Sequence, residues 1–173
     1  MIGDDFNVLT ITHPDVENGI GCRVTIWASG CPHHCPGCHN KHTWGYGQGK
    51  KISELWNEIS EAVNKPYIDG ITLSGGDPLG QNYSALLQLE SFIRTFRTIF
   101  PNKTIWIYSG EVLDELIMKS DMSSRLKFDI LKLCDIMVDG PFIQKLHDPN
   151  LEFRGSSNQR IIDLQKYFKE HFS

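Results

Sequence analysis

Short apolar runs alternate with longer amphipathic stretches along this chain. Three runs are rich in β-branched and aromatic residues, which is typical of buried strands, and they cover residues 24–28, 70–74 and 104–108. Two further strands are expected at 135–138 and 160–162. Because strands buried on both faces read as continuous apolar runs, these segments predict a parallel sheet covered by helices.

Helical periodicity separates the strands. The longest helix is expected at 82–100, and Pro101 ends it. Its apolar residues recur three or four positions apart: Leu86, Leu89, Ile93 and Phe96. A helix with Ser53 as its expected N-cap precedes the second strand, and further helices are expected at 112–118, at 124–133 and near the C-terminus.

This order of elements predicts an α/β fold in which crossover helices connect parallel strands. No linker or repeat interrupts the chain, so one domain is expected over residues 1–173. Five or so strand–helix units are too few for a closed eight-stranded barrel, and the expected fold is an open, partial β/α barrel. In such sheets ligands bind beyond the carboxyl ends of the strands. Three segments of interest follow strand ends: a cysteine-rich segment, the turn 75–78, and Ser109 with Gly110.

Composition narrows the function classes. The net charge is -4 and no basic cluster occurs, so no nucleic-acid partner is expected. No apolar run is long enough to span a bilayer, and the acidic start from Met1 to Asp5 is unlike a signal peptide, so we expect a cytoplasmic protein without a membrane partner. Five cysteines in that reducing compartment favour metal binding, catalysis or core packing over disulfides. Cys22 and Cys134 are expected in the core.

The other three cysteines form the most informative pattern. Cys31, Cys35 and Cys38 are separated by three and by two residues, so one short loop can present three thiolates to an iron–sulfur cluster. Three protein ligands leave one coordination position free, as a catalytic metal centre requires. A zinc site of three cysteines and one histidine is the alternative, and the spacing alone leaves both open. Four histidines could complete such a site: His33, His34, His39 and His42.

A second motif changes that balance. The cysteine spacing, followed one strand later by Ser-Gly-Gly-Asp-Pro at 74–78, resembles the radical S-adenosylmethionine superfamily. Further segments resemble one family within it, the activating proteins of anaerobic (class III) ribonucleoside-triphosphate reductase. These segments are Asn-Gly-Ile-Gly-Cys-Arg at 18–23, Cys-Pro-Gly-Cys-His-Asn-Lys at 35–41, Val-Asp-Gly at 138–140 and Arg-Gly-Ser-Ser-Asn-Gln at 154–159. They occur in family order and extend over most of the chain.

The resemblance implies a mechanism. Cys31, Cys35 and Cys38 would hold a [4Fe-4S] cluster, and the amino and carboxylate groups of S-adenosylmethionine would chelate its fourth iron. One electron, supplied by a flavodoxin or ferredoxin, would cleave the sulfonium and give methionine and a 5'-deoxyadenosyl radical. That radical would remove a hydrogen atom from a glycine Cα of the partner reductase. Cluster and cofactor carry this chemistry, so we expect no catalytic side chain beyond them.

The resemblance also implies contacts to S-adenosylmethionine. Gly75 and Gly76 would let the backbone approach the methionine amino group, and Asp77 would bind that ammonium by a charge-assisted hydrogen bond. Relatives often carry a tyrosine after the third cysteine to face adenine, whereas this chain has His39, which can stack or donate a hydrogen bond, or else be a solvated loop residue. The full set of expected contacts is Gly37, Cys38, His39, Gly75, Gly76 and Asp77.

Other functions are weighed against this one. The chain could activate another glycyl-radical enzyme, such as pyruvate formate-lyase, or act on a free metabolite. Five cysteines are too few for the extra cluster domain of some such activases, and the string at 154–159 favours the reductase. From a different class, a zinc-stabilised binding module would leave the turn at 75–78 unexplained.

Several polar residues stay undecided. They could surround S-adenosylmethionine or form a hydrogen-bonded turn that fastens the last strand, and both roles are open for Asp139, Arg154, Ser157 and Asn158. The segment 44–50 imitates a nucleotide loop, but no strand precedes it, so a flexible connection is expected. Packing is expected for Phe96 and Trp106 and surface positions for His13, His147 and His171.

Overall fold

The computed structural model describes residues 3–172, so Met1 and Ile2 of the acidic start lie outside the described residues. Within this range the strands form one seven-stranded sheet with the order β3-β1-β2-β4-β5-β6-β7. In chain order the strands are β1 (Asn7–Asp15), β2 (Arg23–Ala28), β3 (Lys50–Lys51), β4 (Gly70–Gly75), β5 (Thr104–Tyr108), β6 (Ile136–Asp139) and β7 (Arg160–Asp163). All five strands expected from the sequence are present.

The centre of the sheet is parallel and its edges are antiparallel. Strands β2, β4, β5 and β6 pair in parallel, which confirms the expected core of an α/β fold, and the sheet does not close. Strand β7 pairs antiparallel with β6, so the fifth expected strand runs opposite to the others. Strands β1 and β3 add an antiparallel edge that the sequence pattern did not predict.

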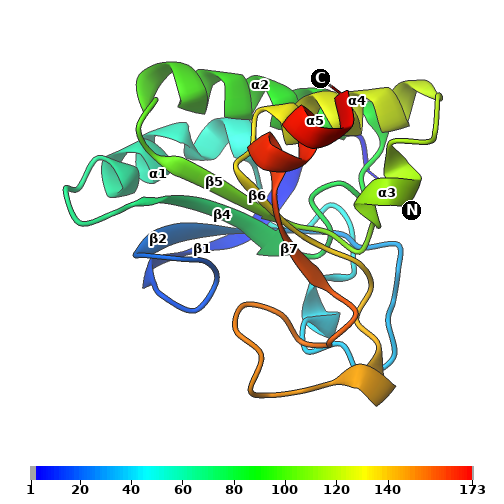
Figure 1. The fold of residues 1–173 in the computed structure, drawn as a ribbon. Helices are drawn as coiled ribbons and strands as arrows, with labels where there is room; N and C mark the ends of the chain where they lie inside the picture. Colours follow the sequence, from blue (N-terminus) through cyan, green and yellow to red (C-terminus); the bar gives the residue numbers. More distant parts are fainter. Residues whose placement is uncertain (1–2, 173) are drawn as a thin grey trace.

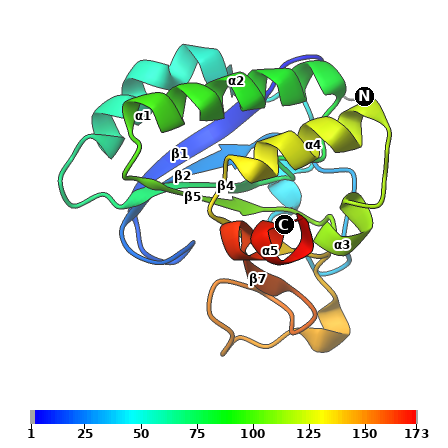
Figure 2. The same cartoon turned by 45° about the horizontal axis from the view of Figure 1, so that its top comes forward.

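The helices gather on one face of the sheet (Figures 1 and 2). They are α1 (Trp56–Val63), α2 (Tyr83–Ile99), α3 (Leu113–Leu116), α4 (Met122–Lys132) and α5 (Leu164–Phe172), with short 3-10 turns at Lys41–Thr43, Ile52–Leu55 and Gln144–Leu146. The segment between β6 and β7, drawn in orange, extends away from these helices in both views. Over residues 3–172, none of the helices combines the length and apolarity needed to cross a bilayer.

Two helices begin with side-chain caps. Asn82 accepts a hydrogen bond from the backbone N–H of Ala85 at 2.9 Å, and Asp121 accepts one from the backbone N–H of Ser124 at 2.9 Å. The expected cap at Ser53 was wrong, because this residue lies inside a 3-10 turn and the turn leads directly into α1 without a side-chain cap.

The core lies between the sheet and this helical layer. The apolar side of α2 is fully buried, as its periodicity predicted, and it packs with the inward side chains of the central strands. Phe96 and Trp106 are core residues, which confirms their expected packing role. Cys134 is buried and Cys22 packs half-buried against the core, also as expected. His13, His147 and His171 are exposed.

One buried cation organises the amino ends of the central strands. Arg23 is 1% exposed, and its guanidinium donates five hydrogen bonds. The acceptors are the hydroxyls of Thr72 and Thr104 and the backbone carbonyls of Ile20, Ile71 and Thr104, at 2.7–3.0 Å. Burial lowers the pKa of Arg23 to about 10, so the side chain stays charged at neutral pH. It therefore fixes the loop before β2 to the starts of β4 and β5.

Candidate functional site

A cavity of about 410 Å³ lies beyond the carboxyl ends of the parallel strands. The loops that follow β2, β4, β5 and β6 all contribute to its wall, as the rule for open α/β sheets predicts. Seven of the eight expected site residues line it: Cys31, Cys35, Cys38, His39, Gly75, Gly76 and Asp77. The eighth, Gly37, lies outside the wall, with a positive φ of 78° and its Cα turned towards Gln144.

The cysteine loop, residues 29–38, packs against the segment 44–46 that follows it. The backbone N–H of Cys31 donates to the carbonyl of Trp44 at 3.1 Å, and His34 stacks on the Trp44 ring at 4.4 Å. The Tyr46 ring covers Gly30, and its hydroxyl donates to a backbone carbonyl at 2.7 Å. The expectation of a flexible connection at 44–50 was therefore wrong, because its aromatic side chains pack against the loop.

Cys31, Cys35 and Cys38 all line this one cavity and are half-buried. Within the described part of the chain, no group of three His, Cys, Asp or Glu side chains is gathered closely enough to hold a single metal ion. A tetrahedral zinc draws its ligands to about 2.0–2.3 Å from one centre, whereas a four-iron cluster spreads its cysteine ligands over a larger body. Three cysteines in one cavity wall are a donor set of the kind that iron–sulfur clusters take from proteins. Burial raises the pKa of Cys31 to about 11, so ligation must displace a proton from this thiol.

The turn at 75–77 lies directly against the cysteine loop. A Cβ built on Gly76 would be 2.2 Å from the carbonyl oxygen of Gly30, and one on Gly75 would be 2.6 Å from the backbone nitrogen of Ala28. Gly75 also has φ of +98°, which disfavours any side chain. The backbone N–H of Asp77 donates to the carbonyl of Gly30 at 2.8 Å. Glycine is thus required here by the close approach of two backbones.

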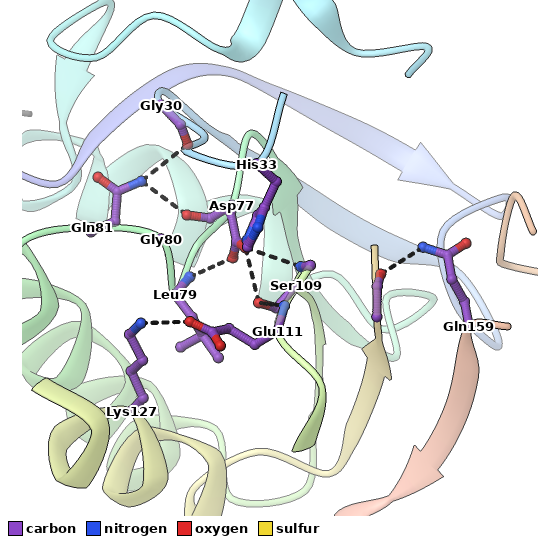
Figure 3. A network of polar contacts seen from close by, with 12 residues as sticks. Gly30, His33, Asp77, Leu79, Gly80, Gln81, Ser109, Glu111, Lys127 and Gln159 are labelled. Atoms are coloured by element: carbon purple, nitrogen blue, oxygen red, sulfur yellow. Dashed lines mark hydrogen bonds and ion pairs between the residues drawn. The ribbon is translucent and has the colours of Figure 1, made fainter. Parts of the chain in front are cut away.

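Asp77 is the most connected side chain of the site (Figure 3). It is 1% exposed, and its Oδ2 accepts hydrogen bonds from His33 Nε2 at 2.6 Å, from the Ser109 hydroxyl at 3.0 Å and from the Gly110 N–H at 3.0 Å. Its Oδ1 accepts from the N–H of Leu79 at 2.9 Å. The hydrogen bond to Asp77 raises the pKa of His33. The carboxylate therefore joins the cysteine loop to the ends of β4 and β5.

A second side chain ties the same two segments together. The amide nitrogen of Gln81 donates to the carbonyls of Ser29, Gly30 and Asp77 at 2.9–3.3 Å, and Gln81 is 7% exposed (Figure 3). Sequence reasoning did not single out Gln81 or the partnership of His33 with Asp77. A polar residue so close behind the turn was the available signal for Gln81.

Two of the four undecided residues have fastening roles. Asp139 is 1% exposed and accepts from the guanidinium of Arg160 at 2.6 and 3.1 Å and from the N–H of Leu113 at 2.9 Å, so it ties β6 to β7 and to α3. Asn158 donates to a backbone carbonyl at 2.8 Å, and Ser157 is exposed. None of Asp139, Ser157 and Asn158 belongs to the cavity wall described above.

Arg154 is the one undecided residue that faces the cavity. No other lysine or arginine occurs among the described residues that line the cavity. One guanidinium nitrogen donates to the carbonyl of Gln159 at 2.5 Å, while Nε is shielded from solvent and has no protein partner. The Tyr108 hydroxyl, in the same wall, is shielded and without a protein partner too. Two residues of this wall therefore carry donor groups that the protein itself leaves unpaired.

His39 lies at the exposed rim of the cavity. Its ring meets the ring of Phe142 at 5.9 Å and the ring of His147 at 5.6 Å. A cluster of aromatic side chains at this rim is thus assembled from the residue after the cysteine loop and from the segment between β6 and β7.

Comparison with known proteins shows which family this chain belongs to. A family model described as 4Fe-4S single cluster domain matches residues 17–162, so the chain is a protein of the single-cluster iron–sulfur class. Two curated relatives cover almost the same span. The anaerobic ribonucleoside-triphosphate reductase-activating protein of Escherichia coli strain K12 is 40% identical over 87% of this chain and 94% of the relative. Its counterpart in Vibrio cholerae is 42% identical over 85% of this chain and 91% of the relative.

This chain therefore belongs to the family of anaerobic ribonucleoside-triphosphate reductase-activating proteins. Among solved structures, QueE from Escherichia coli is 17% identical with a TM-score of 0.45, over 64% of this chain and 56% of that one. A likeness of that size supports no conclusion about this chain.

Proposed function

We propose that this chain activates an anaerobic ribonucleoside-triphosphate reductase by generating a glycyl radical on it, using a [4Fe-4S] cluster and S-adenosylmethionine. The observation that carries the proposal is the cavity in which three cysteines meet the glycine turn at the carboxyl ends of the strands. Family membership supports the same reading.

Cys31, Cys35 and Cys38 would hold the cluster, and S-adenosylmethionine would complete the coordination of the fourth iron. When bound, this pair supplies a 5'-deoxyadenosyl radical that abstracts a hydrogen atom from a glycine of the partner. The protein itself binds and orients the pair and excludes water from it. The half-buried positions of the three cysteines and the packed loop beneath them suit this role.

The wall of the cavity supports specific contacts to S-adenosylmethionine. We assign its methionine part to the turn at Gly75 and Gly76, and its carboxylate to Arg154, the one lysine or arginine in the wall. His39 at the rim is assigned to the adenine, with Cys38 beside it. Gly37 would act through the shape of the loop, because it does not reach the cavity.

The partner would dock over the open end of the sheet, where its glycine loop can enter the cavity. A flavodoxin or ferredoxin would supply the electron, and the reducing cytoplasm is the expected compartment. Neither a nucleic acid nor a membrane is needed for this activity.

The test begins with anaerobic purification and measurement of iron, acid-labile sulfide and zinc. About four irons and four sulfides per chain are expected. Dithionite and S-adenosylmethionine should then yield 5'-deoxyadenosine, and electron paramagnetic resonance should detect a glycyl radical on added anaerobic reductase. Cys35→Ala should abolish both products, while Cys22→Ala, outside the cavity, should keep them.

Two results would redirect the proposal. Stoichiometric zinc without sulfide after anaerobic reconstitution would indicate a zinc-stabilised binding module instead. Formation of 5'-deoxyadenosine with a radical on pyruvate formate-lyase, and none on the reductase, would assign the chain to another glycyl-radical partner.

A further inference from the structure

The carboxylate of Asp77 is already engaged by donors of the protein. It accepts four hydrogen bonds, three on Oδ2 and one on Oδ1. Its side chain is 1% exposed, so little of it is accessible from the cavity. A ligand ammonium in the cavity could therefore reach this carboxylate only if the groups that cover it moved aside.

The donors of Asp77 come from separate parts of the site. His33 belongs to the cysteine loop and lies between Cys31 and Cys35, while Ser109 and Gly110 end β5. The His33 ring also covers Gly110, since a Cβ at Gly110 would be 2.5 Å from the imidazole. The pair of His33 and Asp77 therefore fastens the loop that carries the cysteines to the rigid ends of two central strands.

We propose that Asp77 is a positioning residue that acts through His33: it fixes the cysteine loop for cluster binding and makes no direct contact with S-adenosylmethionine. The inference rests on the proposed function and revises one contact that the motif implies. The methionine ammonium is left to the backbone of the glycine turn and to the cluster iron. Holding the ligand loop before the cluster arrives lowers the ordering cost of binding.

The test separates cluster retention from ligand affinity. Asp77→Asn replaces the carboxylate whose Oδ2 accepts three hydrogen bonds by an amide. His33→Ala removes one of these three donors. In anaerobically reconstituted protein, both variants should lose iron to a chelator at least tenfold faster than the wild type. The dissociation constant of S-adenosylmethionine, measured by calorimetry on the cluster-loaded fraction, should stay within threefold. His33→Gln keeps an N–H donor and should restore part of the retention.

A matched control uses the other buried carboxylate. Asp139→Asn alters a side chain that is equally buried but lies outside the cavity wall, so its iron loss should match that of the wild type. The double variant of Asp77→Asn and His33→Ala should be no worse than either single variant, because the two residues act as one unit.

A second measurement works without any cluster. In metal-free protein, hydrogen exchange of peptides that cover 29–38 should be faster in Asp77→Asn and His33→Ala, and unchanged in Asp139→Asn. If Asp77→Asn misfolds, His33→Ala at a side chain that is 26% exposed still decides the question.

The opposite pattern would overturn the inference. It consists of normal iron retention with a more than tenfold weaker S-adenosylmethionine affinity in Asp77→Asn, and no effect of His33→Ala on exchange or retention. In that case Asp77 binds the ammonium directly while the proposed function stands. Wild-type protein that holds no iron and sulfide would overturn the proposed function, and the exchange experiment would still report on the loop.

Discussion

Two buried charged side chains hold the two ends of the parallel sheet. Arg23 lies at the amino ends of the strands and Asp77 at their carboxyl ends, and each is 1% exposed. Arg23 donates to strand carbonyls and threonine hydroxyls, so its bonds fix elements of the core. Asp77 accepts from loops, so its bonds fix the wall of the cavity. A buried, hydrogen-bonded charge therefore stabilises the core at one end of the sheet and the shape of the cavity at the other.

The difference follows from what each group is bonded to. Loss of a buried donor leaves buried strand carbonyls unsatisfied, which destabilises the whole fold. Loss of an acceptor among loops releases segments that need a fixed shape only for ligand binding. Substitutions at the two ends should thus change different measured quantities.

The largest stability effect is expected for Arg23→Met. This change removes the donor to the carbonyls of Ile20, Ile71 and Thr104, of which the Ile71 bond is fully buried, and the free energy of unfolding should fall by about 3 kcal/mol. Urea denaturation measures it. Arg94→Met, in an exposed pair with Glu90, is the control and should cost less than about 0.5 kcal/mol. A loss of S-adenosylmethionine affinity at unchanged stability would contradict the division between the two ends.

Asp139→Asn should have the next largest effect and lower the free energy of unfolding by about 2 kcal/mol. It weakens charge-assisted hydrogen bonds from Arg160 and from the N–H of Leu113 at a buried carboxylate. Since Asp139 lies outside the cavity wall, the content of iron and sulfide should stay normal. Denaturant midpoints together with iron analysis test the pair of expectations, and a cluster-deficient but stable variant would be inconsistent with them.

Arg154→Met should weaken S-adenosylmethionine binding about tenfold, or about 1.4 kcal/mol, because it removes the one lysine or arginine of the cavity wall. Stability should change little, since one hydrogen bond to Gln159 is lost. Calorimetry on cluster-loaded protein gives the affinity. Arg154→Lys keeps the charge, and its affinity should lie between those of the wild type and Arg154→Met. Equal affinities in these three proteins would exclude the assigned carboxylate contact.

The smallest effect concerns the start of α2, directly behind the glycine turn. Asn82→Ala removes the acceptor for the N–H of Ala85 and should lower the free energy of unfolding by about 1 kcal/mol. Asn82→Ser keeps a side-chain acceptor and should recover most of that stability. Thermal unfolding measures the difference. Ligand affinity should not move, and a change in it would mean that the turn depends on the helix start.

The sequence predicted the centre of the fold well, because continuous apolar runs rich in β-branched residues and periodic helices carry a strong signal. Strand β1 was missed because it contains Pro14 and buries only Val8 of its nine residues, which weakens the strand pattern. The antiparallel direction of β7 was also missed, because direction depends on how the preceding segment returns and not on the strand's own residues.

The wall of the cavity was predictable because its residues follow strand ends in parallel order. The partner of Asp77 was not, since four histidines lie near the cysteines and spacing does not tell which one points to the turn. The structure selects His33 for that contact and stacks His34 on Trp44. Nor could periodicity assign Asp139 to Arg160, because that bond depends on the register between β6 and β7.

The close contact between Gly76 and Gly30 has a consequence for protein engineering and for evolution. A single methyl group on Gly76 would collide with the backbone at Gly30, whichever residue stood there. The cysteine loop and the glycine turn must therefore be inherited, or transplanted to another scaffold, as one two-segment cassette. A graft that carries the cysteines alone would bring the ligands without the surface against which they are shaped.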